Sequence, residues 1–157
     1  MRISIENRLY MDCPEGFREL TEEEKAGMNL ESGGKTLVIS DSVRHIVITA
    51  GWKQISGLSS FLLGRREVSW NMIRQIEKNM KKFSYVWLAD VKKTVDGQVA
   101  RGVDYDYVVN GINMTGESLA IKYNEDIFYF HMYARKVRRE ESMEVFEEIL
   151  GSVAIVD

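Results

Sequence analysis

The chain has 157 residues, of which 45% are hydrophobic and 29% charged, and its formal net charge is −3. This length suits one folded domain, residues 1–157, that buries about two thirds of its unfolded surface. The acidic balance argues against a nucleic-acid partner, because binding to phosphate backbones needs a basic stripe. We interpret the basic clusters at Arg65-Arg66, Lys81-Lys82 and Arg135 to Arg139 as solvated helix ends and strand exits.

The chain has a single cysteine, Cys13, which excludes an intramolecular disulfide and a cysteine-cluster metal site. A buried, unreactive thiol is the default interpretation of such a residue. Residues 1–8 lack the apolar segment of a signal peptide, and no run of about 18 apolar residues occurs. We therefore expect a cytoplasmic protein without a membrane partner.

The N-terminal part of the chain carries signals for a strand and a short helix. Residues 3–11 read as one strand that ends at the turn Pro14-Glu15-Gly16. Thr21 followed by Glu24 is a capping-box pattern, which predicts a helix over residues 22–28.

A hairpin and an ambiguous segment come next. The short helix is expected to close at a Gly33-Gly34 loop. Residues 36–40 and 44–53 then read as two strands, with Asp41-Ser42 as the turn between them. The apolar residues 58–64 follow, and their pattern fits neither a helix nor a strand clearly.

Two longer helices are predicted from helical spacing of apolar residues. Ser69 is a good N-cap for a helix that runs to Lys82, and Arg138 to Glu141 opens a last helix that ends near Gly151-Ser152. The apolar positions of the two helices are Met72, Ile73, Ile76 and Met80 in the first, and Met143, Phe146, Ile149, Leu150 and Val153 in the second.

Residues 84–134 carry the strongest strand signals, four β-runs that we interpret as two hairpins. Asp96-Gly97 is typical of a type I′ turn in the first hairpin. In the second, a two-residue loop at Asn124-Glu125 places Ile121 opposite Phe128 and Leu119 opposite Phe130. These four apolar residues are the predicted core of an α+β domain with a mostly antiparallel sheet of about six or seven strands.

Several short motifs resemble the PsbP-like superfamily, which includes the photosystem II extrinsic protein and the Ran-binding Mog proteins. They are Cys13-Pro-Glu-Gly-Phe17 followed by Thr21-Glu-Glu-Glu24, and the ending Phe146-Glu-Glu-Ile-Leu-Gly-Ser-Val153. The order of elements matches over nearly the whole chain. The resemblance implies an α/β/α sandwich around an antiparallel sheet, and interaction or assembly in place of catalysis. It carries over no catalytic residue.

The predicted register collects polar and aromatic residues on the face opposite the core. The predicted ligand or partner surface comprises Lys122, Tyr129, His131 and Tyr133, widened by Trp87, Asp104 and Asp106. Aromatic rings with polar ends suit a partner surface or a small-molecule groove. The alternative is that a helix covers these rings and their hydroxyls hydrogen-bond internally.

No nucleophile elbow, phosphate loop or dinucleotide fingerprint occurs, and no cofactor is expected. Three functional hypotheses are left. The first is a non-enzymatic interaction or assembly domain with an unidentified protein partner. The second is a small-ligand-binding domain with a cavity beside His131. The third is a metal-dependent enzyme that uses Asp104, Asp106 and His131. His45 is interpreted as a surface residue.

Overall fold

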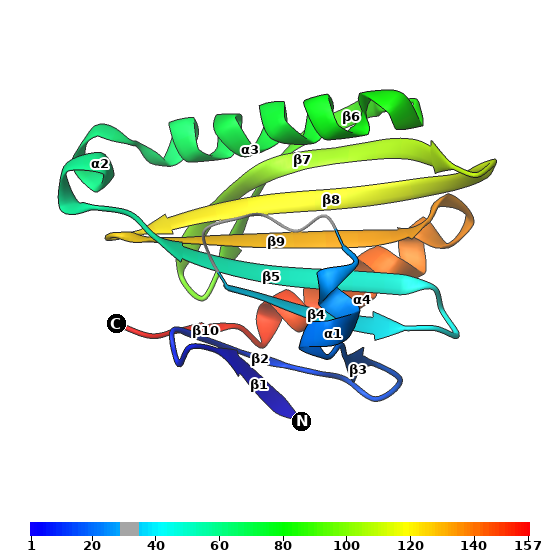
Figure 1. Cartoon of the computed structure of the whole chain (residues 1–157), viewed down its shortest axis with the longest axis horizontal. Coiled ribbons are helices and arrows are strands. Elements are labelled where there is room, and N and C mark those ends of the chain that lie inside the picture. Colours follow the sequence, from blue (N-terminus) through cyan, green and yellow to red (C-terminus); the bar gives the residue numbers. More distant parts are fainter. Residues whose placement is uncertain (29–34) are drawn as a thin grey trace.

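The computed structural model describes residues 1–28 and 35–157, which are arranged around one large sheet (Figure 1). Seven antiparallel strands form this sheet in the order β3-β4-β5-β9-β8-β7-β6. Their bounds are β3 (Arg18–Glu19), β4 (Lys35–Asp41), β5 (Ile46–Gln54), β6 (Val86–Val95), β7 (Gln98–Val109), β8 (Ile112–Tyr123) and β9 (Asp126–Arg135). The predicted Gly33-Gly34 loop lies outside the described residues.

Strands β6 to β9 follow one another as a meander. Asp96 and Gly97 have φ values of 46° and 75°, as the predicted type I′ turn requires. In the second hairpin Ile121 lies opposite Phe128 and Leu119 opposite Phe130, which confirms the predicted register.

The meander also contains a hairpin that was not predicted from the sequence. Asn110 and Gly111, with φ values of 50° and 77°, join β7 directly to β8. The prediction of two separate hairpins was therefore incomplete, because the second begins six residues before Ser118, at Ile112.

The N-terminal segment folds into a small separate sheet. The prediction of one strand over residues 3–11 was wrong, because Glu6 and Asn7 have φ values of 47° and 54° and turn the chain back. The sheet consists of β1 (Arg2–Ile5), β2 (Leu9–Asp12) and β10 (Ala154–Ile155), in the order β1-β2-β10. Cys13 follows β2 and is buried, as predicted.

The link between β4 and β5 is longer than the predicted two-residue turn. Asp41 ends β4, and its Oδ1 accepts hydrogen bonds from the backbone N–H groups of Val43 and Arg44, at 2.9 and 3.0 Å. His45 closes the turn with a φ of 57°, a left-handed conformation that histidine adopts more readily than most residues.

Two short helices flank the sheet. In α1 (Glu22–Ala26) the predicted capping box is present, since Thr21 Oγ1 accepts from Glu24 N and the Glu24 carboxylate accepts from Thr21 N. The ambiguous apolar segment forms α2 (Gly57–Leu62), which Ser56 caps by accepting a hydrogen bond from Ser59 N at 3.1 Å.

The long helix α3 (Arg65–Met80) begins earlier than predicted and runs into a 3₁₀ turn, η1 (Lys81–Phe83). Gly64 takes the N-cap position. Ser69 is instead buried inside the helix, where its Oγ donates to Arg66 O at 2.9 Å. The last helix, α4 (Arg139–Gly151), follows a 3₁₀ turn, η2 (Lys136–Arg138), and confirms the predicted helix.

The two long helices cover opposite faces of the sheet. On one face, α4 packs against the predicted core residues Leu119, Ile121, Phe128 and Phe130, all fully buried. On the other, the apolar stripe of α3 packs against Val103, Tyr105, Ala120 and Tyr129. The fold is thus an α+β sandwich, as predicted. No helix of residues 1–28 and 35–157 combines the length and apolar character needed to cross a membrane.

Candidate functional site

The predicted surface on β9 lies on the α3 face of the sheet. Tyr129 is buried against α3, and His131 and Tyr133 are partly buried on the same face. The rings of His131 and Tyr133 stack with their centroids 6.0 Å apart. The structure therefore brings these three residues together, and α3 packs against the cluster that contains Tyr129 and Tyr133. For these two rings it matches the alternative that a helix covers the face.

A hydrogen-bonded cluster lies under α3. His131 Nδ1 lies 2.6 Å from Ser118 Oγ, and Tyr105 Oη lies 3.1 Å from the same oxygen. Gly116 makes room for this ring, because a Cβ there would lie 2.7 Å from a Tyr105 ring carbon. Ser118 is fully buried, so its hydroxyl cannot reach a substrate. The serine and histidine pair stabilises the packing of the sheet and has no access for catalysis.

Burial lowers the pKa of the His131 imidazole to about 4. The folded state therefore favours the neutral imidazole. Because this pKa lies below the ordinary value of 6.5, the stabilisation is present above pH 6.5 and is lost as the pH falls toward 4.

We expect the variant His131→Asn to lose less stability in acid than the wild-type protein. Its amide retains hydrogen-bonding groups for Ser118 but does not titrate. The fall in the free energy of unfolding between pH 6.5 and pH 4 should be about 1 to 2 kcal/mol smaller in the variant. Urea unfolding at both pH values measures this fall, and equal losses would mean that His131 is well solvated in the folded protein.

The other predicted site residues do not join this cluster. Lys122 lies near the end of β8 opposite Ile127, away from Ser118. Trp87 is half exposed on the edge strand β6, where its Nε1 donates to Asp90 Oδ1 at 3.1 Å. Trp87 does not widen the Tyr129 surface as predicted, because strands β8 and β7 lie between β9 and β6.

Asp104 and Asp106 lie on the α4 face, on the other side of the sheet from His131. Asp104 Oδ2 accepts from Arg139 Nη2 at 3.1 Å, and Asp106 pairs with Lys136 Nζ at 3.1 Å. Neighbouring residues of β7 point to opposite faces of the sheet, so Asp104 and Asp106 lie on the face opposite Tyr105. The metal hypothesis is wrong, because the two carboxylates and His131 lie on opposite faces of the sheet. The described residues contain no group of three His, Cys, Asp or Glu placed to hold a metal ion.

Glu117 is a buried carboxyl that the sequence pattern did not predict. It lies on the α4 face, where Lys93 Nζ approaches its Oε2 to 2.5 Å and also pairs with Glu147. Burial, together with a hydrogen bond to the Asp104 carboxyl, raises the pKa of Glu117 to about 8 against the opposing effect of Lys93. Burial alone would lower the pKa of Lys93. The hydrogen bonds and charges of Glu117 and Glu147 outweigh this effect, so the pKa of Lys93 is raised above its ordinary value. Glu117 is therefore a buried carboxyl whose environment favours its protonated form, although a cation lies beside it.

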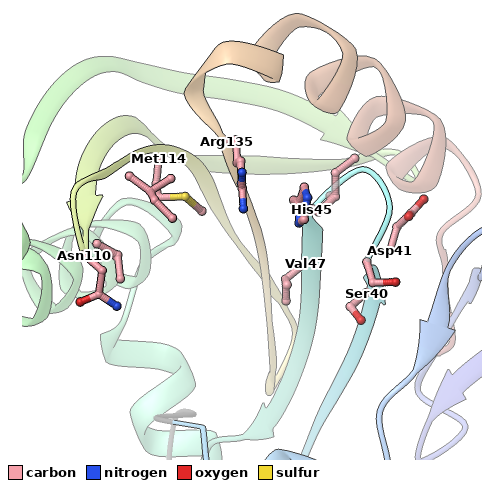
Figure 2. A pocket seen from close by; sticks show the side chains of 11 residues that line it. Ser40, Asp41, His45, Val47, Asn110, Met114 and Arg135 are labelled. Carbon is pink, nitrogen blue, oxygen red and sulfur yellow. The ribbon is translucent and has the colours of Figure 1, made fainter.

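A cavity of about 390 Å³ opens at the end of β9, beyond Tyr133 (Figure 2). Its walls come from the β4–β5 turn, the β7–β8 turn and the last residue of β9, Arg135. The second hypothesis predicted a cavity beside His131, but His131 does not line this one. Period-two spacing continues the His131 and Tyr133 face to Arg135, and this signal could have placed Arg135 on that face, but it does not indicate the cavity.

Large apolar side chains are exposed on the two helices before β6. Leu58, Phe61 and Leu62 project from α2, and Trp70 projects from the second turn of α3. A groove of about 240 Å³ lies beside Trp70, Ile73 and Arg74. Figure 1 shows α2 at one end of the sheet and α3 continuing from it along the sheet. We call Leu58, Phe61, Leu62 and Trp70, with Arg65, Arg66 and Arg74, the α2–α3 surface.

Three solved structures share this fold at low sequence identity. CyanoP from Synechocystis sp. PCC 6803 superposes with a TM-score of 0.72 and 13% identity, over 99% of this chain and 92% of CyanoP. LpqN of Mycobacterium tuberculosis, which is involved in cell envelope biogenesis, gives 0.63 and 14%, over 95% and 83%. PA94 of Pseudomonas aeruginosa gives 0.56 and 8%, over 100% and 97%.

The fold is PsbP-like, as the sequence resemblance implied. No protein-family model matches the sequence, and no curated protein matches it.

Proposed function

We propose that this protein is a non-enzymatic interaction domain that binds an acidic protein partner through the α2–α3 surface. The observation that carries the proposal is the exposure of Phe61, Leu58 and Leu62, at 87%, 72% and 69%. Exposed apolar side chains that lie together and are rimmed by polar residues mark interaction sites.

These apolar side chains do not stabilise α2 within the fold. No residue of α2 is buried. The helix is held instead by the Ser56 cap and by Ser60 Oγ, which donates to Asn124 O at 2.7 Å. Since packing does not require Phe61 to be apolar, its contact with a partner is the function that its chemistry supports.

The charge of this region indicates the chemistry of the partner. Residues 57–88 contain six Arg and Lys residues and two Glu residues, in a chain of net charge −3. Complementary charges guide association and disfavour wrong partners. A partner with an acidic rim around an apolar contact therefore fits the α2–α3 surface. The single unpaired Cys13 fits the cytoplasm as the proposed compartment.

The proposal predicts a position-specific cross-link in cells of the native host. A benzoyl-phenylalanine at position 61 should yield a discrete cross-linked protein. The same group at position 137 is a matched control, because Val137 is 88% exposed but lies on η2. The double variant Arg65→Glu/Arg66→Glu should weaken the position-61 cross-link about ten-fold, whereas Arg138→Glu should leave it unchanged.

Two outcomes would overturn this function. Equal cross-linking from positions 61 and 137, or none from position 61, removes the α2–α3 surface as the contact. Sedimentation of the purified protein with phosphatidylglycerol vesicles, lost in Phe61→Ser, would replace the protein partner with an anionic membrane. A basic surface with exposed aromatic residues also suits such a membrane.

A further inference from the structure

The cavity at the end of β9 combines an apolar wall with polar groups at its sides. Its apolar lining comes from Ile46, Val47, Val109, Ile112 and Met114. Arg135, His45 and Asn110 supply hydrogen-bond donors. In Figure 2 the Arg135 side chain descends from the end of β9 between Met114 on one side and His45 on the other. Its volume of about 390 Å³ lies at the low end for ligand cavities, so it suits a small molecule.

Arg135 has no partner for its charge among the described residues. The cations that follow it along the chain are paired: Lys136 with Asp106, and Arg139 with Asp104. No carboxylate or hydroxyl of residues 1–28 and 35–157 lies within ion-pair or hydrogen-bond distance of the Arg135 guanidinium. A partly buried guanidinium beside an apolar wall is therefore available to an anion.

Asp41 is the one carboxylate among the described residues of the cavity wall, and it does not compete for this role. Asp41 is 3% exposed, and its Oδ2 accepts from Arg44 Nε at 2.6 Å. Its Oδ1 accepts from two backbone N–H groups of the β4–β5 turn. Asp41 is thus satisfied within the turn, and the cavity has an unbalanced positive charge.

We propose that this cavity binds a small organic monocarboxylate. The ligand carboxylate pairs with the Arg135 guanidinium, whose planar fork matches the two carboxylate oxygens. The apolar body of the ligand lies against Val47 and Met114 and displaces water from them. His45 and Asn110 lie at the sides of the cavity and supply further donors to the carboxylate. This proposal is independent of the α2–α3 surface.

Titration of ¹⁵N-labelled protein with sodium hexanoate at constant ionic strength tests the proposal. The amide shifts should concentrate at residues 40–47, 109–114 and 135 and give one saturable dissociation constant. Arg135→Gln should raise that constant about ten-fold or more, because a hydrogen-bonded charge pair is lost. Arg138→Gln is the matched control, with the same change of charge on η2 outside the cavity, and should bind as wild type does.

Two comparison ligands define the chemistry. Hexan-1-ol has the same apolar body without the charge, and inorganic phosphate has the charge without the apolar body. Both should bind at least about ten-fold more weakly than hexanoate. Equal binding of hexanol would show that Arg135 is not used, and equal binding of phosphate would show a general anion site. Either result overturns the proposal.

The variant Arg135→Lys tests the planar shape of the guanidinium. It keeps the positive charge but loses the planar fork, and it should bind hexanoate about three-fold to ten-fold more weakly. Unchanged spectra at 20 mM hexanoate, or shifts confined to residues outside the cavity, would contradict a monocarboxylate site.

Discussion

Phe130→Ala should lower the free energy of unfolding by about 3 to 5 kcal/mol. Phe130 is fully buried in the middle of β9, where it lies opposite Leu119 and faces α4. Truncation removes its ring from the core and leaves a cavity that the neighbouring strands cannot close, since β9 is bonded on both sides. Urea denaturation measures the loss, with the m-value as a check on two-state behaviour.

Phe61→Ala makes the same chemical change on the surface and serves as the matched control. Phe61 is 87% exposed, so its truncation should change the free energy of unfolding by less than about 0.5 kcal/mol. The pair therefore separates a phenylalanine that folds the protein from one that is available to a partner. A large loss of stability in Phe61→Ala would show that α2 packs on the sheet and would count against the α2–α3 surface.

The core of the meander could be predicted because its information is local. Alternation of apolar and polar residues in β8 and β9 has a period of two, and a slip by one residue would move Phe128 and Phe130 out of the core. Asp96-Gly97 fixed the first turn because few residues other than Asn, Asp and Gly accept positive φ at both positions. Pattern and turn chemistry agreed, so the register was correct.

The start of β8 could not be predicted because its residues resemble those of a loop. Gly116 and Glu117 are weak strand formers, and the pattern gives no reason to bury Thr115 or Glu117. They are buried because partners from distant segments satisfy them: Thr115 through Arg139, and Glu117 through Lys93. Such pairing depends on the order of strands in the sheet, which is a tertiary property.

The sequence showed which face of β9 was polar but not what covers it. The pattern placed Tyr129, His131 and Tyr133 together without indicating that α3 packs against Tyr129 and Tyr133. It also assigned Arg135 to a solvated basic cluster. Only the approach of the β4–β5 and β7–β8 turns encloses a cavity around this residue, and the sequence separation of these turns hides their contact.

At pH 9 the Glu117→Gln variant should have a free energy of unfolding about 3 kcal/mol greater than the wild-type protein. Glu117 is 1% exposed, and burial together with the Asp104 carboxyl raises its pKa from 4.5 to about 8. Between these values the folded protein holds a proton that the unfolded chain has lost. The stability that this proton provides is present below pH 4.5 and is lost as the pH rises through 8. Gln does not titrate, so the variant avoids the alkaline loss.

Glu147→Gln is the control that separates burial of Glu117 from the pairing of Lys93. Glu147 shares Lys93 with Glu117, but its side chain is 52% exposed, so its replacement should cost less than about 1 kcal/mol at any pH. Urea unfolding from pH 5 to pH 9 should show a declining curve for wild type and Glu147→Gln, and a flatter one for Glu117→Gln. If Glu117→Gln is instead less stable than wild type at every pH, Glu117 is ionised in the fold. Its ion pair with Lys93 would then outweigh the cost of burying the charge.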